Sequence, residues 1–215
     1  MAINITPSKE TIFKKIRQAL TQSTPLPFPQ SENSQGVYPV SSQELELEFA
    51  ERFTKLQGKF AYCHDKQDLA NQLNGLLTQQ KWEKVFFASS DPELQKILGL
   101  TTYPTHQTND LAGCDVSVTF CECLVARTGS MVLSAAQHSG RTVSVYAPIH
   151  ICIAFTSQLV YDVKDALQLL KDKYGANIPS QISFATGPSR TADIEKTLVV
   201  GVHGPKEVYC FLVEG

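Results

Sequence analysis

The sequence lacks the long apolar runs, the excess of one charge and the short catalytic motifs by which many protein classes are recognised. No stretch approaches the roughly 18 consecutive apolar residues of a membrane-spanning helix. Lys and Arg number 19 against 21 Asp and Glu, so we expect no binding to nucleic acid. Residues 1–20 have lysines and an arginine scattered through a helical pattern, with no continuous apolar core like that of a signal peptide, which predicts a soluble, cytoplasmic protein.

Motifs of several common enzyme classes are also missing. The chain has no G-x-S-x-G elbow, no H-E-x-x-H helix and no Walker loop, and no G-x-G-x-x-G opens its first helix. The sequence therefore assigns no catalytic residue.

Cysteine is present, but without the spacing of a metal site. Most of the six cysteines lie inside apolar runs, as reduced cysteines that pack as small hydrophobic residues do. Cys121 and Cys123 invite a metal interpretation, and alternate residues of a strand would point both thiols to one face. A zinc or iron–sulfur site, however, generally needs four ligands in paired C-x2-C spacing. We therefore expect no metal and no cofactor bound by this chain.

Proline is concentrated near the N-terminus, in residues 23–39. Before it, Thr6 and Pro7 can begin a helix whose apolar residues recur at helical spacing up to Leu20. We expect residues 1–40 to form an amphipathic helix followed by an extended linker, free to dock on a partner or on another subunit of a homo-oligomer. Residues 41–215 are then the main domain.

The main domain begins with helix and strand patterns in alternation. Ser41 and Glu44 predict a capping box for a first helix, and Asp65 and Asp91 predict caps for two more, with apolar strands over residues 59–63 and around residues 84–90. Strand and helix in alternation favour a parallel sheet with helices on its faces.

The remainder of the domain is rich in strand patterns. Residues 114–160 read as β-structure, including the segment 141–148, and Asp162 predicts the cap of a helix that ends at Gly175. Three strand patterns complete the chain. The fold class predicted is α/β, with a Rossmann-like open sheet of mixed direction and helices on both faces.

Two apolar runs near the C-terminus each end in a Gly-Pro pair. Gly187 and Gly204 are expected at carboxyl ends of parallel strands, where ligands bind in open α/β folds. Ser189 or Thr191 would cap a following helical turn. Free amides of that turn, with the guanidinium of Arg190, would bind a carboxylate or a phosphate. His203 and Lys206 could contribute to binding the same anion.

Each of these features has a structural alternative. The Gly-Pro pairs are equally consistent with tight turns, with Arg190 in a surface ion pair to Asp193 or Glu195. Thr128, Gly129 and Ser130 form either a hairpin turn or a backbone cradle, and His150 is either a hydrogen-bonded structural histidine or a polar group at a sheet edge. The candidate ligand-binding residues are Gly187, Ser189, Arg190, Thr191, His203, Gly204, Thr128, Gly129, Ser130 and His150.

The stretch "TGPSRTADIEKTLVVGVHGPKEV", supported by "ARTGSMVLSAAQHSGRTVSVYAPIHICI", resembles the LUD-domain family, specifically its members of the lactate-utilization C type. The resemblance implies that residues 41–215 are a LUD domain with the fold of the NagB, ribose-5-phosphate isomerase and CoA-transferase proteins. It also implies a role in oxidising L-lactate to pyruvate, alongside two partner proteins that carry the iron–sulfur clusters.

One segment departs from the family pattern. Residues 126–130 of this chain are Ala-Arg-Thr-Gly-Ser, where family members usually have Ala-Glu-Thr-Gly-Thr. Arg127 therefore stands in place of the acid of the family pattern. The loop is thereby better suited to an anion, with Arg141 as a second basic residue nearby, and Glu122 is not taken as a substitute nucleophile. Three hypotheses follow: a subunit of a lactate-oxidising complex, a stand-alone enzyme or sensor that binds a small carboxylate, sugar phosphate or nucleotide, and a purely structural domain.

Overall fold

A computed structural model of the chain describes residues 7–22, 41, 43–88, 90–102, 106–108, 110–191 and 199–215. The chain divides into two compact units, Met1–Val40 and Ser41–Gly215. Thr6 and the proline-rich segment 23–39 lie outside the described residues, and so do Asp193 and Glu195.

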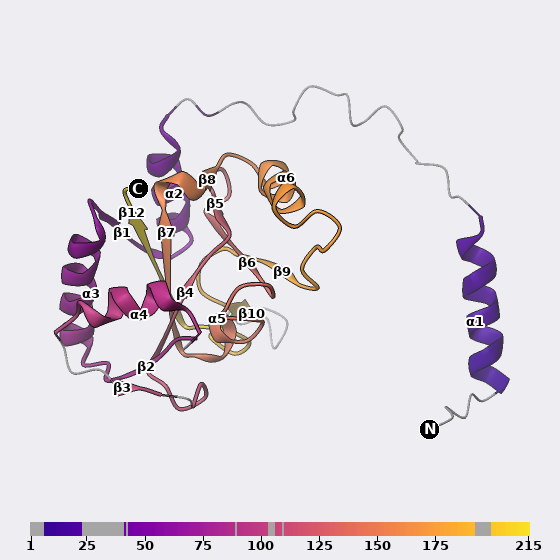
Figure 1. Cartoon of the computed structure of the whole chain (residues 1–215), viewed down its shortest axis with the longest axis horizontal. Helices are drawn as coiled ribbons and strands as arrows, with labels where there is room; N and C mark the ends of the chain where they lie inside the picture. The colour runs from indigo at the N-terminus through magenta and orange to yellow at the C-terminus, as the bar shows by residue number, and fades with distance from the viewer. Residues whose placement is uncertain are drawn as a thin grey trace. The chain divides into compact units, whose positions relative to one another are not determined.

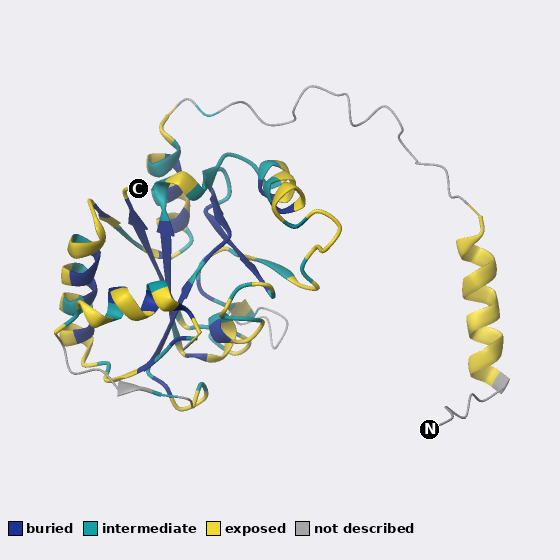
Figure 2. Cartoon of the chain, in the orientation of Figure 1, coloured by how far each residue is buried: buried dark blue, intermediate teal, exposed yellow. Residues whose placement is uncertain are grey.

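The first unit contains the predicted N-terminal helix. α1 spans Pro7–Leu20, and its described side chains are exposed along its whole length (Figure 2). The apolar stripe of Ile12, Phe13, Ile16 and Leu20 is 41–79% exposed. The amphipathic helix is therefore confirmed, and its apolar face is open within this unit.

The second unit is built on a six-stranded parallel sheet. Its strand order is β1-β12-β7-β4-β2-β3, and every neighbouring pair is parallel. The strands are β1 (Lys59–Cys63), β2 (Lys84–Phe86), β3 (His106–Gln107), β4 (Val116–Phe120), β7 (Ile149–Phe155) and β12 (Glu207–Val213). Apolar residues on both faces of the central strands are buried, as expected of a sheet covered on both sides.

Two helices cover one face of this sheet (Figure 1). α3 (Lys66–Gln80) and α4 (Pro92–Gly99) pack leucine and isoleucine side chains on it, among them Leu73 and Ile97. Asp65 caps α3 by accepting a hydrogen bond from the Asp68 amide at 2.7 Å. Asp91 caps α4 in the same way. Both caps confirm the predictions from sequence.

The other face is covered by α2 (Leu45–Lys55) and by a second sheet, with strand order β8-β5-β6-β9. The strands are β5 (Cys123–Val125), β6 (Ser130–Ser134), β8 (Leu159–Val160) and β9 (Ile182–Ala185). α6 (Val163–Tyr174) packs on its outer side through Ala166 and Leu170. A capping box of Asp162 and Asp165 begins α6. The α/β fold is confirmed, with a second sheet forming part of one covering layer.

Three local predictions were wrong. Glu44 is the N-cap residue of α2 and makes no side-chain cap, and the Ser41 hydroxyl, which was expected to cap the helix, donates to the Glu48 carboxylate at 2.5 Å. Within residues 141–148 the chain forms a short helix, α5 (Val143–Tyr146). The described part of the next-to-last predicted strand is only β11 (Val199–Val200), which pairs with β10 (Arg190–Thr191) in a separate ribbon.

The topology of the parallel sheet marks one crevice. After β2 the chain adds β3 on one side, then returns to add β4, β7 and β12 on the other side of β2. The direction of winding therefore reverses between β2 and β4. In open α/β sheets the carboxyl ends of the two strands at such a reversal diverge, and ligands bind between them.

Candidate functional site

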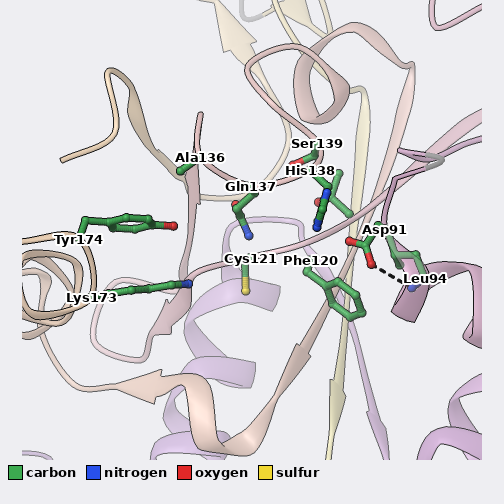
Figure 3. Close-up of a pocket in the computed structure, with 11 residues that line it drawn as sticks. Asp91, Leu94, Phe120, Cys121, Ala136, Gln137, His138, Ser139, Lys173 and Tyr174 are labelled. Carbon is green, nitrogen blue, oxygen red and sulfur yellow. Dashed lines mark hydrogen bonds between the residues drawn. The ribbon is translucent and has the colours of Figure 1, made fainter. Parts of the chain in front are cut away.

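A cavity of about 400 Å³ lies at this reversal. We call it the carboxyl-edge cavity. Thr119, Phe120 and Cys121, at the end of β4, form its floor, and Asp91 and Leu94 approach from the start of α4. The loop after β6 contributes Ala136, Gln137, His138 and Ser139. The last residues of α6, Lys173 and Tyr174, complete the wall (Figure 3).

Glu122 holds the α6 side of the cavity in place. Its side chain is 0% exposed, and it accepts hydrogen bonds from Ser134 Oγ at 2.5 Å, Tyr174 OH at 2.7 Å and Lys173 Nζ at 2.8 Å. Burial acts to raise the pKa of this carboxyl, but these three donors outweigh it and the pKa is lowered. Glu122 is therefore an ionised buried anchor for the two α6 side chains.

The opposite side of the cavity carries a histidine and an acid. His138 Nδ1 lies 3.1 Å from the Ser90 hydroxyl, and the Asp91 carboxylate is engaged by the Glu93 and Leu94 amides at 3.2 Å. Figure 3 shows His138 close to Asp91, with Lys173 and Tyr174 entering from the other side. An ammonium group thus faces an imidazole across the cavity, an arrangement suited to a small ligand that has both a carboxylate and a second polar group.

The two Gly-Pro loops come together, but not where the sequence placed them. The Ser189 amide donates a hydrogen bond to the Pro205 carbonyl at 3.0 Å, and the Gly201 amide donates one to the Ser189 carbonyl at 3.0 Å. Gly187 follows β9 of the second sheet, and Gly204 precedes β12. The prediction that both glycines lie at carboxyl ends of parallel strands was wrong, because neither preceding segment is a strand of the parallel sheet.

A second cavity, of about 280 Å³, lies beside these loops, near the amino ends of β7 and β12. We call it the amino-side cavity. Five of the ten candidate ligand-binding residues line it, and they are Gly187, Ser189, His203, Gly204 and His150. The structure therefore brings half of the predicted set to one cavity.

Arg190 is directed elsewhere. Its guanidinium donates to the Leu56 carbonyl at 2.6 Å and to Gln57 Oε1 at 3.2 Å. Leu56 is the C-cap residue of α2, where backbone carbonyls need donors and a positive charge is favourable. The prediction that Arg190 converges with the loop amides on a ligand was wrong, and neither Arg190 nor Thr191 lines the amino-side cavity.

Replacing Arg190 with alanine is expected to lower the free energy of unfolding by about 1 kcal/mol, because the last turn of α2 loses its donor. Urea unfolding of the purified protein measures the change. Arg190→Lys is the matched control and should recover only part of the loss, since one ammonium cannot reproduce both guanidinium contacts. Unchanged stability in both variants would contradict the capping role.

Thr128 and Gly129 lie in the turn of the β5–β6 hairpin and Ser130 is the first residue of β6, so the hairpin is the one of the two predicted alternatives that the structure shows. The Ser130 hydroxyl lies 2.7 Å from the Thr128 and Thr186 hydroxyls. Gly129 has a φ of +63°, and a Cβ there would approach the Phe53 amide nitrogen to 2.7 Å. The glycine thus permits the hairpin to pack on α2, and the three residues line neither cavity.

The two arginines near this hairpin have structural partners. Arg127 forms an ion pair with Asp162 at 2.6 Å, which ties the hairpin to the start of α6. Arg141 donates to the Ser180 hydroxyl at 2.6 Å. The basic residue that replaces the acid of the family pattern therefore connects two elements of the fold.

His150 is a buried histidine between the two cavities. It is 1% exposed and lines the amino-side cavity, while its Nε2 lies 2.8 Å from the hydroxyl of Thr119 in the carboxyl-edge cavity. Burial lowers the pKa of the imidazole to about 4, so the ring is neutral at pH 7. Of the two interpretations offered for His150, the hydrogen-bonded histidine is the one this geometry matches.

The six cysteines are free and buried. Cys121 packs with Cys152 and Cys210 between the parallel sheet and its covering layer, whereas Cys123 packs against α6. The expectation that Cys121 and Cys123 share a face was wrong, because Cys121 lies before β5 and not within it. Among the described residues, no three His, Cys, Asp or Glu side chains are grouped so that they could hold a metal ion.

Sequence reasoning missed most of the carboxyl-edge cavity. Lys173 was one of several lysines on a helix, and His138 was part of a loop; no motif distinguished either. Glu122 lies in no recognisable motif, and its role becomes visible only from its hydrogen bonds to Lys173 and Tyr174, which are 51 and 52 residues away in the sequence.

The sequence of this chain matches a known protein family over the segment that forms most of this architecture. The family model described as LUD domain matches residues 104–213, which is just over half of the chain and includes β4–β12 with the end of β4, the loop after β6 and the end of α6. The chain belongs to the LUD domain family. Residues matched by the family model therefore supply most of the lining of both cavities.

Curated relatives of this LUD protein carry the name Lactate utilization protein C. The protein of Bacillus velezensis is 42% identical over 101 residues, that of Bacillus licheniformis 41% over 102 and that of Bacillus subtilis 39% over 101. Each alignment covers 46% of this chain and 42% of the relative. The chain thus spans less than half the length of these relatives.

A solved structure supports the fold. The crystal structure of a DUF162 family protein from Deinococcus radiodurans superposes with a TM-score of 0.55 at 20% identity, covering 81% of this chain and 99% of that one. At this identity the likeness shows the fold alone. In the part of the chain described here, no helix is both long and apolar enough to cross a membrane.

Proposed function

We propose that this LUD protein acts in L-lactate utilization, as a subunit of the system that oxidises L-lactate to pyruvate together with iron–sulfur partner proteins. The observation that carries the proposal is the 39–42% identity to three proteins named Lactate utilization protein C.

The iron–sulfur clusters are assigned to the partner proteins. Oxidation of L-lactate to pyruvate releases two electrons and two protons, so the system needs an electron acceptor. The cysteines of this chain are poor cluster ligands, because five of the six pack as apolar side chains within the three hydrophobic clusters and burial raises the pKa of thiols such as Cys63 and Cys123 to about 12. A thiolate, the form that binds metal, is disfavoured there.

The carboxyl-edge cavity is the part of this chain that would bind the small carboxylate. Lys173 offers a cation that is 54% exposed and held in position by Glu122. His138, on the opposite side, offers a group that can donate to or accept from the 2-hydroxyl or 2-oxo oxygen. A cavity of about 400 Å³ accommodates lactate or pyruvate with room for a partner's group to approach.

The test combines growth with co-purification. A host strain that lacks the gene should fail to grow on L-lactate as sole carbon source, and the wild-type chain should restore growth while Lys173→Gln restores it poorly. The tagged full-length chain should co-purify with proteins that contain iron and acid-labile sulfide. Undiminished growth of the deletion strain on lactate, or a purified chain free of such partners, would overturn the proposal.

A further inference from the structure

We propose that the amino-side cavity and a larger cavity adjoining it form a binding site for a nucleoside monophosphate, separate from the carboxyl-edge cavity. The adjoining cavity has a volume of about 560 Å³. The two cavities share Val145, His203 and Gly204, so they form one elongated site, which we call the amino-side groove. The proposal is independent of the proposed function in lactate utilization.

The inner part of the groove suits a nucleobase. Leu133, Phe184 and Val208 give it apolar walls, and His150 and Ser189 add polar groups. No lysine, arginine or carboxylate is among the described residues that line it. An uncharged, flat and heteroatom-rich ring is the kind of group that such walls and hydrogen-bonding side chains accept.

His150 lines this inner part as an uncharged side chain. Its pKa of about 4 keeps the imidazole neutral at pH 7. One nitrogen is engaged with Thr119, and a neutral imidazole offers one donor and one acceptor in total. The histidine therefore contributes directional hydrogen bonding to a ligand and not a positive charge, which favours a base over a phosphate at this end.

The outer part of the groove suits a sugar and a phosphate. Lys206 and His203 line it together with the backbone of Gly201 and Gly204. Lys206 is exposed, and within the described part of the chain no carboxylate forms an ion pair with it. A phosphate needs a cation and approachable donors of this kind.

Tyr146 extends the outer part. Its side chain belongs to α5 and is 66% exposed at the wall of the groove. An exposed tyrosine ring in the cavity that Lys206 also lines provides a face against which a ribose packs. A small carboxylate would leave most of this volume empty, whereas a single lysine is too little charge for a ligand with several phosphates. One phosphate on a nucleoside matches both the charge and the size.

Isothermal titration calorimetry of the full-length protein tests the proposal. The ligands are AMP, GMP, CMP and UMP, with the matching nucleosides and inorganic phosphate as separate probes. At least one monophosphate should bind with submillimolar affinity and at least tenfold more tightly than its nucleoside and than inorganic phosphate. If none of the four reaches submillimolar affinity, the proposal is overturned.

Two variants locate the site. Lys206→Ala should weaken binding of the monophosphate at least tenfold and leave the nucleoside little changed, because the phosphate contact alone is removed. Lys173→Gln, in the carboxyl-edge cavity, should leave nucleotide binding unchanged, so that this site and the proposed carboxylate site can fail separately. Equal nucleotide affinity of Lys206→Ala and wild type would place the nucleotide elsewhere and contradict the proposal.

Discussion

Between pH 7 and pH 4 the protein is expected to lose roughly 3 kcal/mol of folding free energy through His150 alone. The pKa of this imidazole falls from 6.5 to about 4 in the folded state because it is buried. Between these two values the unfolded chain binds a proton that the folded chain does not. Stability therefore falls as the pH drops through 6.5, and this contribution levels off below the folded pKa.

The measurement is the free energy of unfolding in urea at several pH values from about 7.5 to about 3.5, which spans both pKa values. His150→Gln keeps a polar side chain near Thr119 but cannot titrate, so its stability should depend less steeply on pH than that of the wild type. His64→Gln is the control for the same substitution at a histidine whose side chain is 81% exposed. A His150→Gln variant with the same slope as the wild type would show that His150 is not the group responsible.

Replacing Glu122 with alanine is expected to lower the free energy of unfolding by about 3 kcal/mol. The carboxylate is fully buried and satisfies Ser134, Lys173 and Tyr174 together. Its removal leaves the Ser134 hydroxyl, in a residue only 3% exposed, without this acceptor. It also releases the last turn of α6 from the cavity wall.

The matched control is another carboxylate–lysine pair at the surface. Glu93 and Lys66 are 34% and 54% exposed at the side chain, so Glu93→Ala should change stability by less than about 1 kcal/mol. Glu122→Gln should lower the free energy of unfolding by an amount between those for Glu122→Ala and Glu93→Ala, since the amide oxygen accepts hydrogen bonds but the side chain carries no charge. Equal effects of Glu122→Ala and Glu93→Ala would refute the anchoring role.

The pH dependence of the Glu122 effect has a definite sign. Its folded pKa is lowered, so the stabilisation is present above the unfolded value of about 4.3 and is lost as the pH falls through the folded pKa. The gap in stability between wild type and Glu122→Gln should accordingly narrow below about pH 4. This window lies below that of His150, so the two titrations can be separated.

Local features of the fold were predictable from sequence. The caps Asp65, Asp91 and Asp162 were found because a capping side chain and the amides it satisfies lie within three residues. The hairpin turn at Gly129 was one of two stated alternatives for the same reason. Such interactions depend on neighbours in the chain, which sequence patterns display directly.

Features that depend on distant contacts were not predictable. Val143 and Val145 alternate as in a strand, yet they form a helical turn in which Val143 is buried and Val145 is 38% exposed. Arg190 was predicted to bind a ligand, because the sequence does not show that the carbonyl groups at the end of α2 lie beside its guanidinium. The carboxyl-edge cavity was missed because Glu122 and Lys173 are 51 residues apart.

The central claim is that the carboxyl-edge cavity binds a small carboxylate through Lys173. Calorimetric titration of pyruvate and of L-lactate into the wild-type protein and Lys173→Gln tests it most directly. We expect the wild type to bind at least one of the two acids, and the variant to bind it at least about tenfold more weakly, a difference of about 1.4 kcal/mol. Equal affinity in both proteins, or no binding of either acid to the wild type, would contradict it.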